Sequence, residues 1–382
     1  MQKNRIFVCF VAIILSIILN FAFLNFLNNN VSLAESDNLL TSAKSMILIE
    51  QSTGKVVFSH NEHEKLAMAS TTKILTAIYV LEHTENLDNV VKIPKEATKI
   101  SGTSIGLKEG EHLTIRELLY GLMLRSGNDC AVALAIEASG SEEQFVSDVN
   151  NFLSENGFSE THVCNPHGLS ENDHYTSASD LAKITAYAMK NSTFKEIVST
   201  KEKKISNELE SKFNRNLKNK NKLLFNFEGA DGVKTGFTMK AGRCFVGSAT
   251  RNNMQFICVL LNCVPMFEEC EKLLNIAFEN YQMCKLIESG REYFIENEEG
   301  KTIFVSDIDF SYPLSKQEKQ NIKLKIVKCD KNLTNENGDS CLAEMQIYLE
   351  NHLIFSHKIY NINVIENNGS IANNFLKIVK EM

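Results

Sequence analysis

Three short segments of this sequence bring together residue types that could perform nucleophilic catalysis. The first is Ser70-Thr71-Thr72-Lys73, in which residues three positions apart share one helical face, so that hydroxyl and ammonium can meet. A serine hydroxyl is a weak nucleophile until a base removes its proton. Lys73 can be that base only if burial or a neighbouring cation lowers its pKa. Because a Ser-x-x-Lys string is common by chance, this segment alone carries no function.

The second segment, Ser126-Gly127-Asn128, falls between two predicted helices. A hydroxyl there could relay a proton to a leaving group, and an Asn amide could bind a peptide carbonyl. The alternative is purely structural: Gly127 would end one helix, and Asn128 or Asp129 would cap the next.

The third segment, Lys234-Thr235-Gly236, precedes a strand-like run that starts at Gly242. A strand edge with these residues lets a substrate backbone pair alongside while the Lys meets a carboxylate. The Gly keeps the approach unobstructed. An ordinary turn before a strand is the alternative interpretation.

The predicted elements would hold these segments in place. A helix with Ile74, Ala77, Ile78 and Leu81 on one face starts near Ser70, and Thr114 with Glu117 forms a capping box before another. The predicted helices cover residues 67–83, 115–124, 131–138, 141–153, 177–190 and 266–285. A hairpin over residues 45–58 and strands over 242–250 and 254–262 lie at the two ends of this region. Strands flanking helices indicate an α/β or α+β layer arrangement.

A different pattern follows residue 290. Residues 322–326, 345–349 and 353–364 alternate with a period of two, which predicts a small antiparallel β domain. The last residues, 371–382, gather apolar side chains on one side and charged ones on another. This pattern fits an amphipathic helix on a membrane surface, and a segment that is frayed or docked on the protein itself is an equal alternative.

The N-terminus predicts export. Lys3 and Arg5 precede an apolar run over residues 6–19, and Ser32-Leu33-Ala34 offers small residues for cleavage. This order is typical of a secretory signal peptide, and an uncleaved membrane anchor is the alternative. Either way, we expect the mature protein to be extracytoplasmic, in the cell wall or on the outer face of the cytoplasmic membrane.

Composition argues against several other classes. The 382 residues carry a formal net charge of -7, which is not the basic footprint of a nucleic-acid-binding protein. The basic stretch 201–222 is interleaved with Glu and Asn, so we expect a solvated loop or hairpin face. Of 10 cysteines, Cys9 is in the leader, and an odd remainder at irregular spacing predicts no disulfide framework. No cysteine or histidine spacing fits a metal site.

Taken together and in this order, the three segments resemble the motifs of the penicillin-binding protein and serine β-lactamase superfamily. Asn165-Pro166-His167-Gly168-Leu169 and the stretch around Lys234, residues 231–238, look like the low-molecular-weight D-alanyl-D-alanine carboxypeptidases. Residues 175–181 and 219–224 add to the likeness, which covers residues 43–285. More weakly, residues 290–368 resemble the family's C-terminal β domain, and the tail resembles its amphipathic anchor.

The resemblance implies a fold and a set of domains. The fold is an α/β (α+β) penicillin-binding/β-lactamase-like domain, with an antiparallel sheet covered by helices and a helical subdomain, followed by a small all-β domain. The implied segments are a signal peptide or anchor (1–34), a carboxypeptidase domain (35–285), a β domain (286–368) and a membrane-associated tail (369–382).

The resemblance also implies an activity: removal of the terminal D-Ala from peptidoglycan stem peptides ending in D-Ala-D-Ala. An acyl-enzyme forms on Ser70, β-lactam antibiotics trap that serine covalently, and no cofactor or metal takes part. The family's roles carry over to eight residues of this sequence. Lys73 would be the base, and Ser126 and Lys234 would shuttle the proton. Asn128 would hold the substrate amide, and Lys234, Thr235 and Gly236 would meet the substrate. The backbone N–H groups of Ser70 and Phe237 would form the oxyanion hole.

Two departures and two alternatives accompany this interpretation. Some family members have His at Phe237 and Arg at Lys220, which leaves substrate preference open. A β-lactamase is the nearer alternative, but its deacylating Glu-x-x-Leu-Asn string occurs here only at residues 271–275, after Lys234. A non-catalytic wall-binding protein is the other, and the intact motifs argue against it. We expect His167 to be structural.

Overall fold

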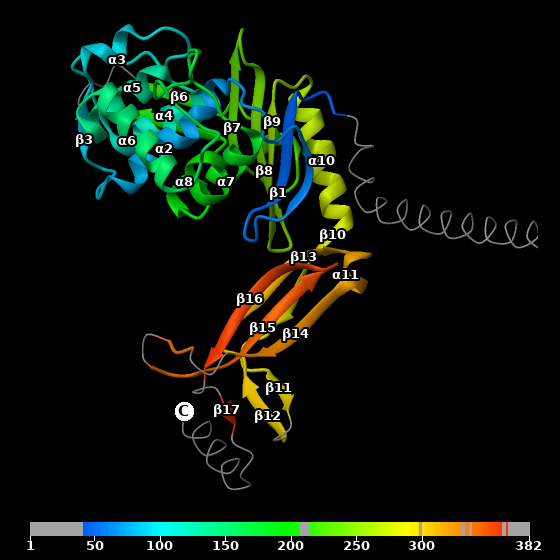
Figure 1. Cartoon of the computed structure of the whole chain (residues 1–382). Coiled ribbons are helices and arrows are strands. Elements are labelled where there is room, and N and C mark those ends of the chain that lie inside the picture. Colours follow the sequence, from blue (N-terminus) through cyan, green and yellow to red (C-terminus); the bar gives the residue numbers. More distant parts are fainter. Residues whose placement is uncertain are drawn as a thin grey trace, which may run out of the picture. The chain divides into compact units, whose positions relative to one another are not determined.

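The computed structural model describes residues 41–206, 214–297, 300–329, 333–335, 338–360 and 364–365 (Figure 1). The predicted leader (1–34) and tail (369–382) lie outside these residues. The described chain divides into two compact units. The larger contains residues 41–49, 257–272 and the described part of 56–248, and the smaller contains residues 50–55, 249–256 and the described residues after 272.

A five-stranded sheet, most of it in the larger unit, has the order β2-β1-β9-β8-β7. Its strands are β1 (Ser45–Glu50), β2 (Val56–His60), β7 (Ala230–Thr238), β8 (Gly242–Arg251) and β9 (Met254–Leu261). The predicted N-terminal hairpin is confirmed, since β1 and β2 pair antiparallel. The Lys234 segment was expected before a strand, but it lies inside β7. Because β7 is an edge strand, its free side can accept another extended chain.

Helices gather beside the β7 edge of the sheet, as Figure 1 shows. They are the 3₁₀ turn η1 (Ala69–Thr72), α2 (Lys73–Glu82), α3 (Lys95–Lys99), α4 (Ile115–Arg125), α5 (Asn128–Ser139), α6 (Glu142–Glu155), α7 (Ala178–Ala188), α8 (Ser192–Ser199) and α9 (Leu223–Asn226). The face of α2 that carries Ile74, Ala77 and Ile78 is buried in a core shared with α4 and α5, as the helical period predicts.

Helix starts follow the sequence signals closely. The Thr114–Glu117 capping box is formed, because the Thr114 hydroxyl accepts the Glu117 N–H and the Glu117 side chain reaches back to Thr114 N. Ser141 caps α6 in the same manner by accepting the Gln144 N–H at 3.1 Å. These caps satisfy backbone N–H groups that have no partner within the helix at its start. Each of these helices therefore begins at the residue where the sequence signal predicts its start.

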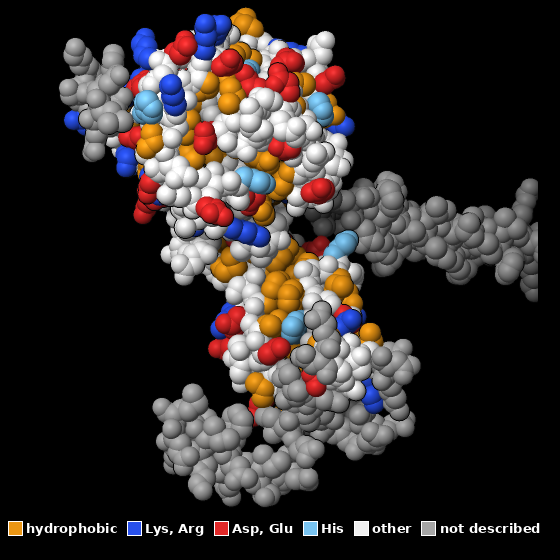
Figure 2. Space-filling view, turned by 90° about the vertical axis from the view of Figure 1, so that its left-hand side faces the viewer, with side chains coloured by type: hydrophobic (Ala, Val, Ile, Leu, Met, Phe, Trp, Pro, Cys, Tyr) orange, Lys and Arg blue, Asp and Glu red, His pale blue; other side chains and the backbone are white. Residues whose placement is uncertain are grey.

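The basic stretch 201–222 forms a short hairpin, in agreement with one of the two structures expected for it. Strands β5 (Glu202–Ser206) and β6 (Asn214–Lys218) pair antiparallel. Ile205 and Leu217 point into the core, while Glu202 and Lys218 lie exposed on the solvent side. On the face shown in Figure 2, acidic and basic side chains are intermingled over the larger unit.

The closing helix is shorter than the sequence predicts. Helix α10 covers Met266–Asn280, and β10 (Tyr281–Ile287) follows it without a loop. The predicted extension to residue 285 is wrong, because Tyr281 to Ile287 form a strand that pairs antiparallel with β13. Phe267, in the first turn of α10, packs edge-on against Phe245 of β8, with ring centroids 4.9 Å apart. This contact holds the start of α10 against the sheet.

The smaller unit is a set of antiparallel β-sheets, as expected. Its sheets have the orders β10-β13, β11-β12-β17 and β14-β15-β16. Besides β10 they use β11 (Glu292–Asn297), β12 (Gly300–Val305), β13 (Phe310–Ser315), β14 (Ile322–Lys328), β15 (Cys341–Leu349), β16 (His352–Tyr360) and β17 (Val364–Ile365), and a short helix α11 (Glu318–Asn321) precedes β14. Along β15, Ala343, Met345 and Ile347 are buried, which explains the period-two pattern.

Cysteine pairing differs from the expectation in one respect. Cys329 and Cys341 form a disulfide, because the β14–β15 pairing brings the ends of these strands together. The other described cysteines are free, and Cys130, Cys244 and Cys258 are buried as small apolar side chains. No group of His, Cys, Asp or Glu residues in the described chain is arranged to hold a metal ion. None of the helices described is long and apolar enough to cross a membrane.

Candidate active site

Ser70 lies in a 3₁₀ turn rather than in the first turn of an α-helix. The turn η1 spans Ala69–Thr72, and α2 begins at Lys73. In a 3₁₀ turn, side chains three positions apart are eclipsed, so the Ser70 and Lys73 side chains still meet. Ala69, with φ of 48°, has left-handed backbone geometry. That geometry costs a non-glycine residue about 1–2 kcal/mol, and strain of this kind concentrates at functional sites.

Lys73 is completely buried, and its ammonium is hydrogen bonded to oxygen atoms of other residues. Its Nζ lies 3.1 Å from Ser70 Oγ, 2.7 Å from Asn128 Oδ1 and 2.5 Å from the His167 carbonyl. Burial lowers the pKa of Lys73 to about 7, because the charged form loses its hydration. A neutral amine there donates to the Asn128 and His167 oxygens and keeps its lone pair for the proton of Ser70.

The second segment joins α4 to α5, and it carries both chemical and structural roles. Ser126 ends α4 in a left-handed conformation with φ of 64°, and Gly127 precedes the first residue of α5, Asn128. Asn128 uses its whole amide: Oδ1 accepts from Lys73, and Nδ2 donates to the Ser101 carbonyl at 2.7 Å. The caps expected as the alternative are wrong in detail: Ser126 rather than Gly127 ends α4, and Gly127 precedes α5 without a side-chain cap from Asn128 or Asp129.

Lys234 is also buried, on the edge strand β7. Burial first, and then the charge of Lys73, lowers the pKa of Lys234 well below its ordinary value. Lys234 Nζ donates to the Thr235 carbonyl at 2.9 Å. Among the described residues it makes no hydrogen bond to Ser126, which lies across the same pocket.

Gly236 lets β7 approach the nucleophile. A Cβ at this position would stand 3.0 Å from Ser70 N and 3.1 Å from the Ala69 Cβ. Only glycine allows this approach without displacing a backbone. The next residue, Phe237, is 57% exposed, so its ring does not fill the core. The strand thus brings main-chain groups beside Ser70 and turns the Phe237 side chain outward.

The loop 165–169, noted above in the sequence, packs against the turn that carries Ser70 and contacts Lys73. Gly168 has φ of +86°, and a Cβ there would lie 2.0 Å from the Ala69 carbonyl oxygen. The His167 carbonyl accepts from Lys73, while the ring accepts the Leu169 N–H at 3.2 Å. Burial, with the charge of Lys73, lowers the pKa of His167 to about 3, so the ring is neutral. His167 therefore has the structural position expected for it.

Two supporting residues were not predicted. His174 is buried and hydrogen bonds the Thr72 hydroxyl at 2.8 Å, and that hydroxyl donates to the Ala69 carbonyl. Asp129 accepts the backbone N–H groups of Ile105, Gly106 and Leu107. It thereby fixes the loop whose Thr103 lines the site. Only the position of Asp129, next to Asn128, could have indicated its role.

A pocket of about 420 Å³ opens over Ser70 and joins all three motifs. Its lining comes from Ser70, Thr103, Ser126, Lys220, Lys222, Thr235, Gly236, Phe237, Arg243, Met266 and Phe267. Lys73 is hydrogen bonded to Ser70 of this lining and to Asn128, and Lys234 directly precedes Thr235 on β7. The structure therefore brings together every residue that the sequence assigns to the site, and it adds Thr103, Lys222, Arg243, Met266 and Phe267.

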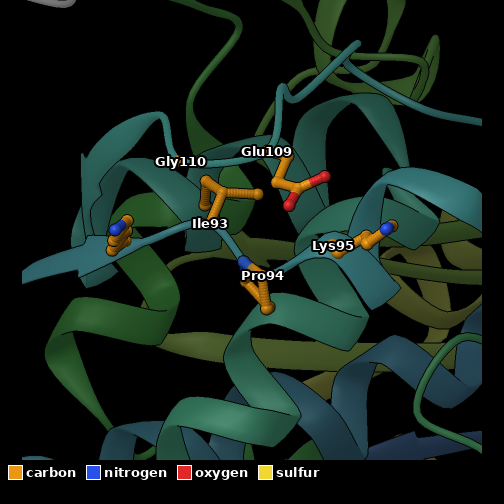
Figure 3. A pocket seen from close by; sticks show the side chains of 6 residues that line it. Ile93, Pro94, Lys95, Glu109 and Gly110 are labelled. Atoms are coloured by element: carbon orange, nitrogen blue, oxygen red, sulfur yellow. The ribbon is translucent and has the colours of Figure 1, made fainter.

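A larger hollow of about 580 Å³ lies elsewhere, between the segments around Lys95 and Glu109 (Figure 3). Lys92, Ile93, Pro94 and Gly110 complete its lining. It contains neither a hydroxyl nor a thiol next to a base, so it offers no nucleophile. The pocket over Ser70 is the candidate active site.

Comparison with known proteins decides the family. A model of the family described as D-alanyl-D-alanine carboxypeptidase, peptidase S11, matches residues 32–264. The chain belongs to this family. It is a serine-type D-alanyl-D-alanine carboxypeptidase. D-alanyl-D-alanine carboxypeptidase DacF of Bacillus subtilis is 34% identical over 311 residues, which are 78% of this chain and 79% of that protein.

Other members of the carboxypeptidase family agree in sequence and fold. The D-alanyl-D-alanine carboxypeptidase of a Streptomyces strain, K15, is 35% identical over 59% of this chain and 84% of its own. Penicillin-binding protein 5 of Haemophilus influenzae superposes with a TM-score of 0.71 at 25% identity, covering 86% of this chain and 98% of that one. The predicted α+β fold followed by a β domain is confirmed.

Proposed function

We propose that this carboxypeptidase removes the terminal D-Ala from peptidoglycan stem peptides through an acyl-enzyme on Ser70. The observation that carries this proposal is the 3.1 Å contact between Lys73 Nζ and Ser70 Oγ. The amine in that contact has its pKa lowered to about 7 by burial. A base whose pKa lies near the working pH combines a large neutral fraction with a useful proton affinity.

The reaction has two halves that use the same residues. Lys73 takes the proton of Ser70, whose oxygen attacks the carbonyl of the penultimate D-Ala. Ser126 and Lys234 pass a proton to the leaving nitrogen, and the terminal D-Ala departs as a free amino acid. Water then attacks the ester, with Lys73 again receiving a proton, and Ser70 is regenerated. No cofactor enters either half.

Substrate binding follows from the edge strand and the Asn128 amide. An extended peptide would pair with the free side of β7, where Gly236 leaves room. Asn128 would hold the substrate amide, and Lys234 with Thr235 would meet the terminal carboxylate. The backbone N–H groups of Ser70 and Phe237 would bind the oxyanion, and each such donor contributes about 3 kcal/mol to the transition state.

The same geometry supports covalent inhibition by β-lactams. A β-lactam carbonyl attacked by Ser70 yields an ester whose leaving nitrogen stays tethered, so the water step is obstructed. We expect slow release, because the string 271–275 that resembles a deacylating segment lies on α10, and Glu271 does not line the Ser70 pocket. A β-lactamase is therefore not favoured by any contact at the site.

Location belongs to the same proposal. The sequence of residues 1–34 supports export of the protein. The protein's proposed substrate, the peptidoglycan stem peptide, likewise lies outside the cytoplasmic membrane. The apolar residues in the sequence of 371–382, at a spacing that would place them on one side of a helix, support peripheral attachment to that membrane. Fractionation of cells that produce the chain with and without residues 369–382 would test the attachment: release of the shortened protein into the soluble fraction supports it.

The decisive experiment uses the chain from Glu35 to Met382 and a peptide ending in D-Ala-D-Ala. Free D-Ala should accumulate with the unaltered protein and disappear with Ser70→Ala. Mass spectrometry of the penicillin-treated protein should find the adduct on the peptide that contains Ser70. If Ser70→Ala releases D-Ala at the original rate, the mechanism is refuted.

A further inference from the structure

A chain of three hydrogen bonds ends on the backbone just before the nucleophile. The Cys164 N–H donates to His174 Nδ1 at 3.0 Å, and His174 Nε2 lies 2.8 Å from the Thr72 hydroxyl. That hydroxyl donates to the Ala69 carbonyl at 2.7 Å. His174 and Thr72 are both buried, and the reaction steps described above give neither of them a role.

The three hydrogen bonds have a fixed direction. A hydroxyl carries one hydrogen, and that of Thr72 is donated to a carbonyl, so toward His174 the hydroxyl oxygen can only accept. His174 Nε2 therefore bears the ring hydrogen, and Nδ1 is the free acceptor that the Cys164 N–H requires. Burial, followed by the charges of His162 and Lys73, lowers the pKa of His174 to about 4. The ring is therefore neutral at neutral pH, and a single tautomer satisfies the whole chain.

The carbonyl at the end of this chain belongs to the same peptide group as the Ser70 N–H. In a trans peptide, the C=O and N–H bonds lie in one plane and point in opposite directions. The Ala69 oxygen faces the Thr72 hydroxyl, and a Cβ at Gly168 would lie 2.0 Å from it. On the other side, a Cβ at Gly236 would lie 3.0 Å from Ser70 N. The oxygen end of the peptide is thus held within the fold, and its nitrogen end lies beside β7.

The orientation of this peptide group matters because the Ser70 N–H is one of the two proposed oxyanion donors. Such a donor stabilises the transition state most when its direction is set in advance. A hydrogen bond to the C=O of an amide also polarises the group, which strengthens its N–H as a donor. Ala69, with φ of 48°, has unfavourable left-handed geometry. The hydrogen bond to its carbonyl opposes relaxation of the turn.

We propose that His174, acting through the Thr72 hydroxyl, is a positioning residue that directs the Ser70 N–H toward the oxyanion. This inference rests on the proposed function, because it concerns the acyl transfer to Ser70. Neither His174 nor Thr72 lines the pocket over Ser70, so both act through the backbone rather than on the substrate.

Substitutions at both ends of the Thr72–His174 hydrogen bond test the proposal. Thr72→Val keeps the shape of the side chain and removes the hydroxyl. We expect it to slow acylation of Ser70 by benzylpenicillin, read by mass, about tenfold, since full removal of an oxyanion donor costs about a hundredfold to a thousandfold. His174→Leu should slow acylation by a similar factor. His174→Gln should restore most of the rate, because an amide can accept the Cys164 N–H and donate to Thr72.

The infrared carbonyl band of the penicilloyl ester on Ser70 is a direct readout of the oxyanion site. Hydrogen bonds to an ester carbonyl lower its stretching frequency, so a misdirected donor should shift the band to higher frequency. We expect this shift in Thr72→Val and in His174→Leu, and not in His174→Gln. A residue that only stabilised the fold would leave the band of the folded protein in place.

Thr185→Val is the matched control. Thr185 is buried in α7, and its hydroxyl donates to the Leu181 carbonyl at 2.7 Å, the same distance as in the hydrogen bond that Thr72 donates. Removing this hydroxyl should lower the free energy of unfolding by a similar amount. It should leave the rate of Ser70 acylation and the ester band unchanged.

If Thr72→Val slows acylation no more than Thr185→Val, the proposal is wrong. An ester band that stays in place in both Thr72→Val and His174→Leu would also overturn it. The His174 variants test the proposal even if Thr72→Val does not fold. Both readouts concern the ester on Ser70 rather than D-Ala release, so a failure of the proposed function with the peptide is distinguishable from a failure of this inference.

Discussion

At the scale of single residues, the catalytic behaviour depends on one buried amine. Lys73 has Ser70, Asn128 and the His167 carbonyl around it, and burial lowers its pKa to about 7. The neutral amine is the active base, and it predominates above that pKa. The rate of Ser70 acylation should therefore rise as pH increases through about 7 and then level off.

The corresponding measurement is the second-order rate of penicillin acylation over a series of pH values. Lys73→Arg should lose at least about a hundredfold in rate at every pH, because a guanidinium cannot act as a base in this range. Lys240→Arg is the control, since Lys240 is exposed and donates to the Glu171 carbonyl. A wild-type rate independent of pH would show that another group removes the proton.

The residues that act directly were predictable, and those that support them were not. Ser70, Lys73, Ser126, Asn128 and Lys234 stand in fixed local motifs, so type and spacing sufficed. Other residues are tied to the site only by contacts between distant parts of the chain. His174 reaches Thr72, Asp129 reaches residues 105–107, and Arg243 lies over Phe237. No local pattern encodes those pairs.

At the scale of elements, the loop 165–169 determines how η1 sits. Gly168 packs against Ala69, whose left-handed backbone precedes Ser70. Gly168→Ala should therefore both destabilise the protein and slow acylation. We expect a loss of about 3 kcal/mol in the free energy of unfolding, since a steric clash adds to the cost of a positive φ.

Gly140→Ala is a matched control in the same unit. Gly140 has φ of +84°, close to the +86° of Gly168, but a Cβ there would have nothing within 4 Å. Gly140→Ala should lower the free energy of unfolding only by the cost of a positive φ, about 1 kcal/mol. It should leave the rate of Ser70 acylation unchanged. Urea unfolding and penicillin labelling of both variants provide the comparison. Equal effects of the two substitutions would mean that the packing of Gly168 on Ala69 is unimportant.

Elements with strong periodicity were predicted well, and their ends less so. The N-terminal hairpin and α4 with its capping box match the sequence signals. The helix expected from residue 67 is instead a 3₁₀ turn followed by α2, because Ala69 has a positive φ that no α-helix contains. The helix expected up to residue 285 ends at Asn280, where pairing with β13 outweighs helical propensity.

At the scale of the whole molecule, the smaller unit contains its own ion pair, between Lys55 and Glu318. Lys55 Nζ lies 2.6 Å from Glu318 Oε1 and 2.9 Å from the Pro313 carbonyl, with the Tyr281 and Tyr312 rings about it. Its side chain is 7% exposed. Glu318→Gln would leave this ammonium buried without a counter-charge, so the unit should lose about 2 to 3 kcal/mol of stability.

Asp309→Asn is the control, because its ion pair with Lys285 is exposed on the same unit and should matter little. Chemical unfolding measured beside penicillin labelling separates stability from catalysis. We expect Glu318→Gln to lower the unfolding midpoint and to label Ser70 at the wild-type rate in the absence of denaturant. Slower labelling of Ser70 would mean that the Lys55–Glu318 ion pair also influences the catalytic pocket.

The burial of Lys73 also ties folding to proton uptake. In the unfolded chain this lysine returns to its ordinary pKa of 10.5, against about 7 when folded. Between these values the unfolded chain binds more protons, so the free energy of unfolding rises with pH. Lys234, whose pKa is also lowered by burial, acts in the same direction. A mildly alkaline pH should therefore raise the free energy of unfolding of the catalytic unit and also increase the fraction of neutral Lys73 that can act as the base. At neutral pH the buried amine contributes less to stability than it does at alkaline pH.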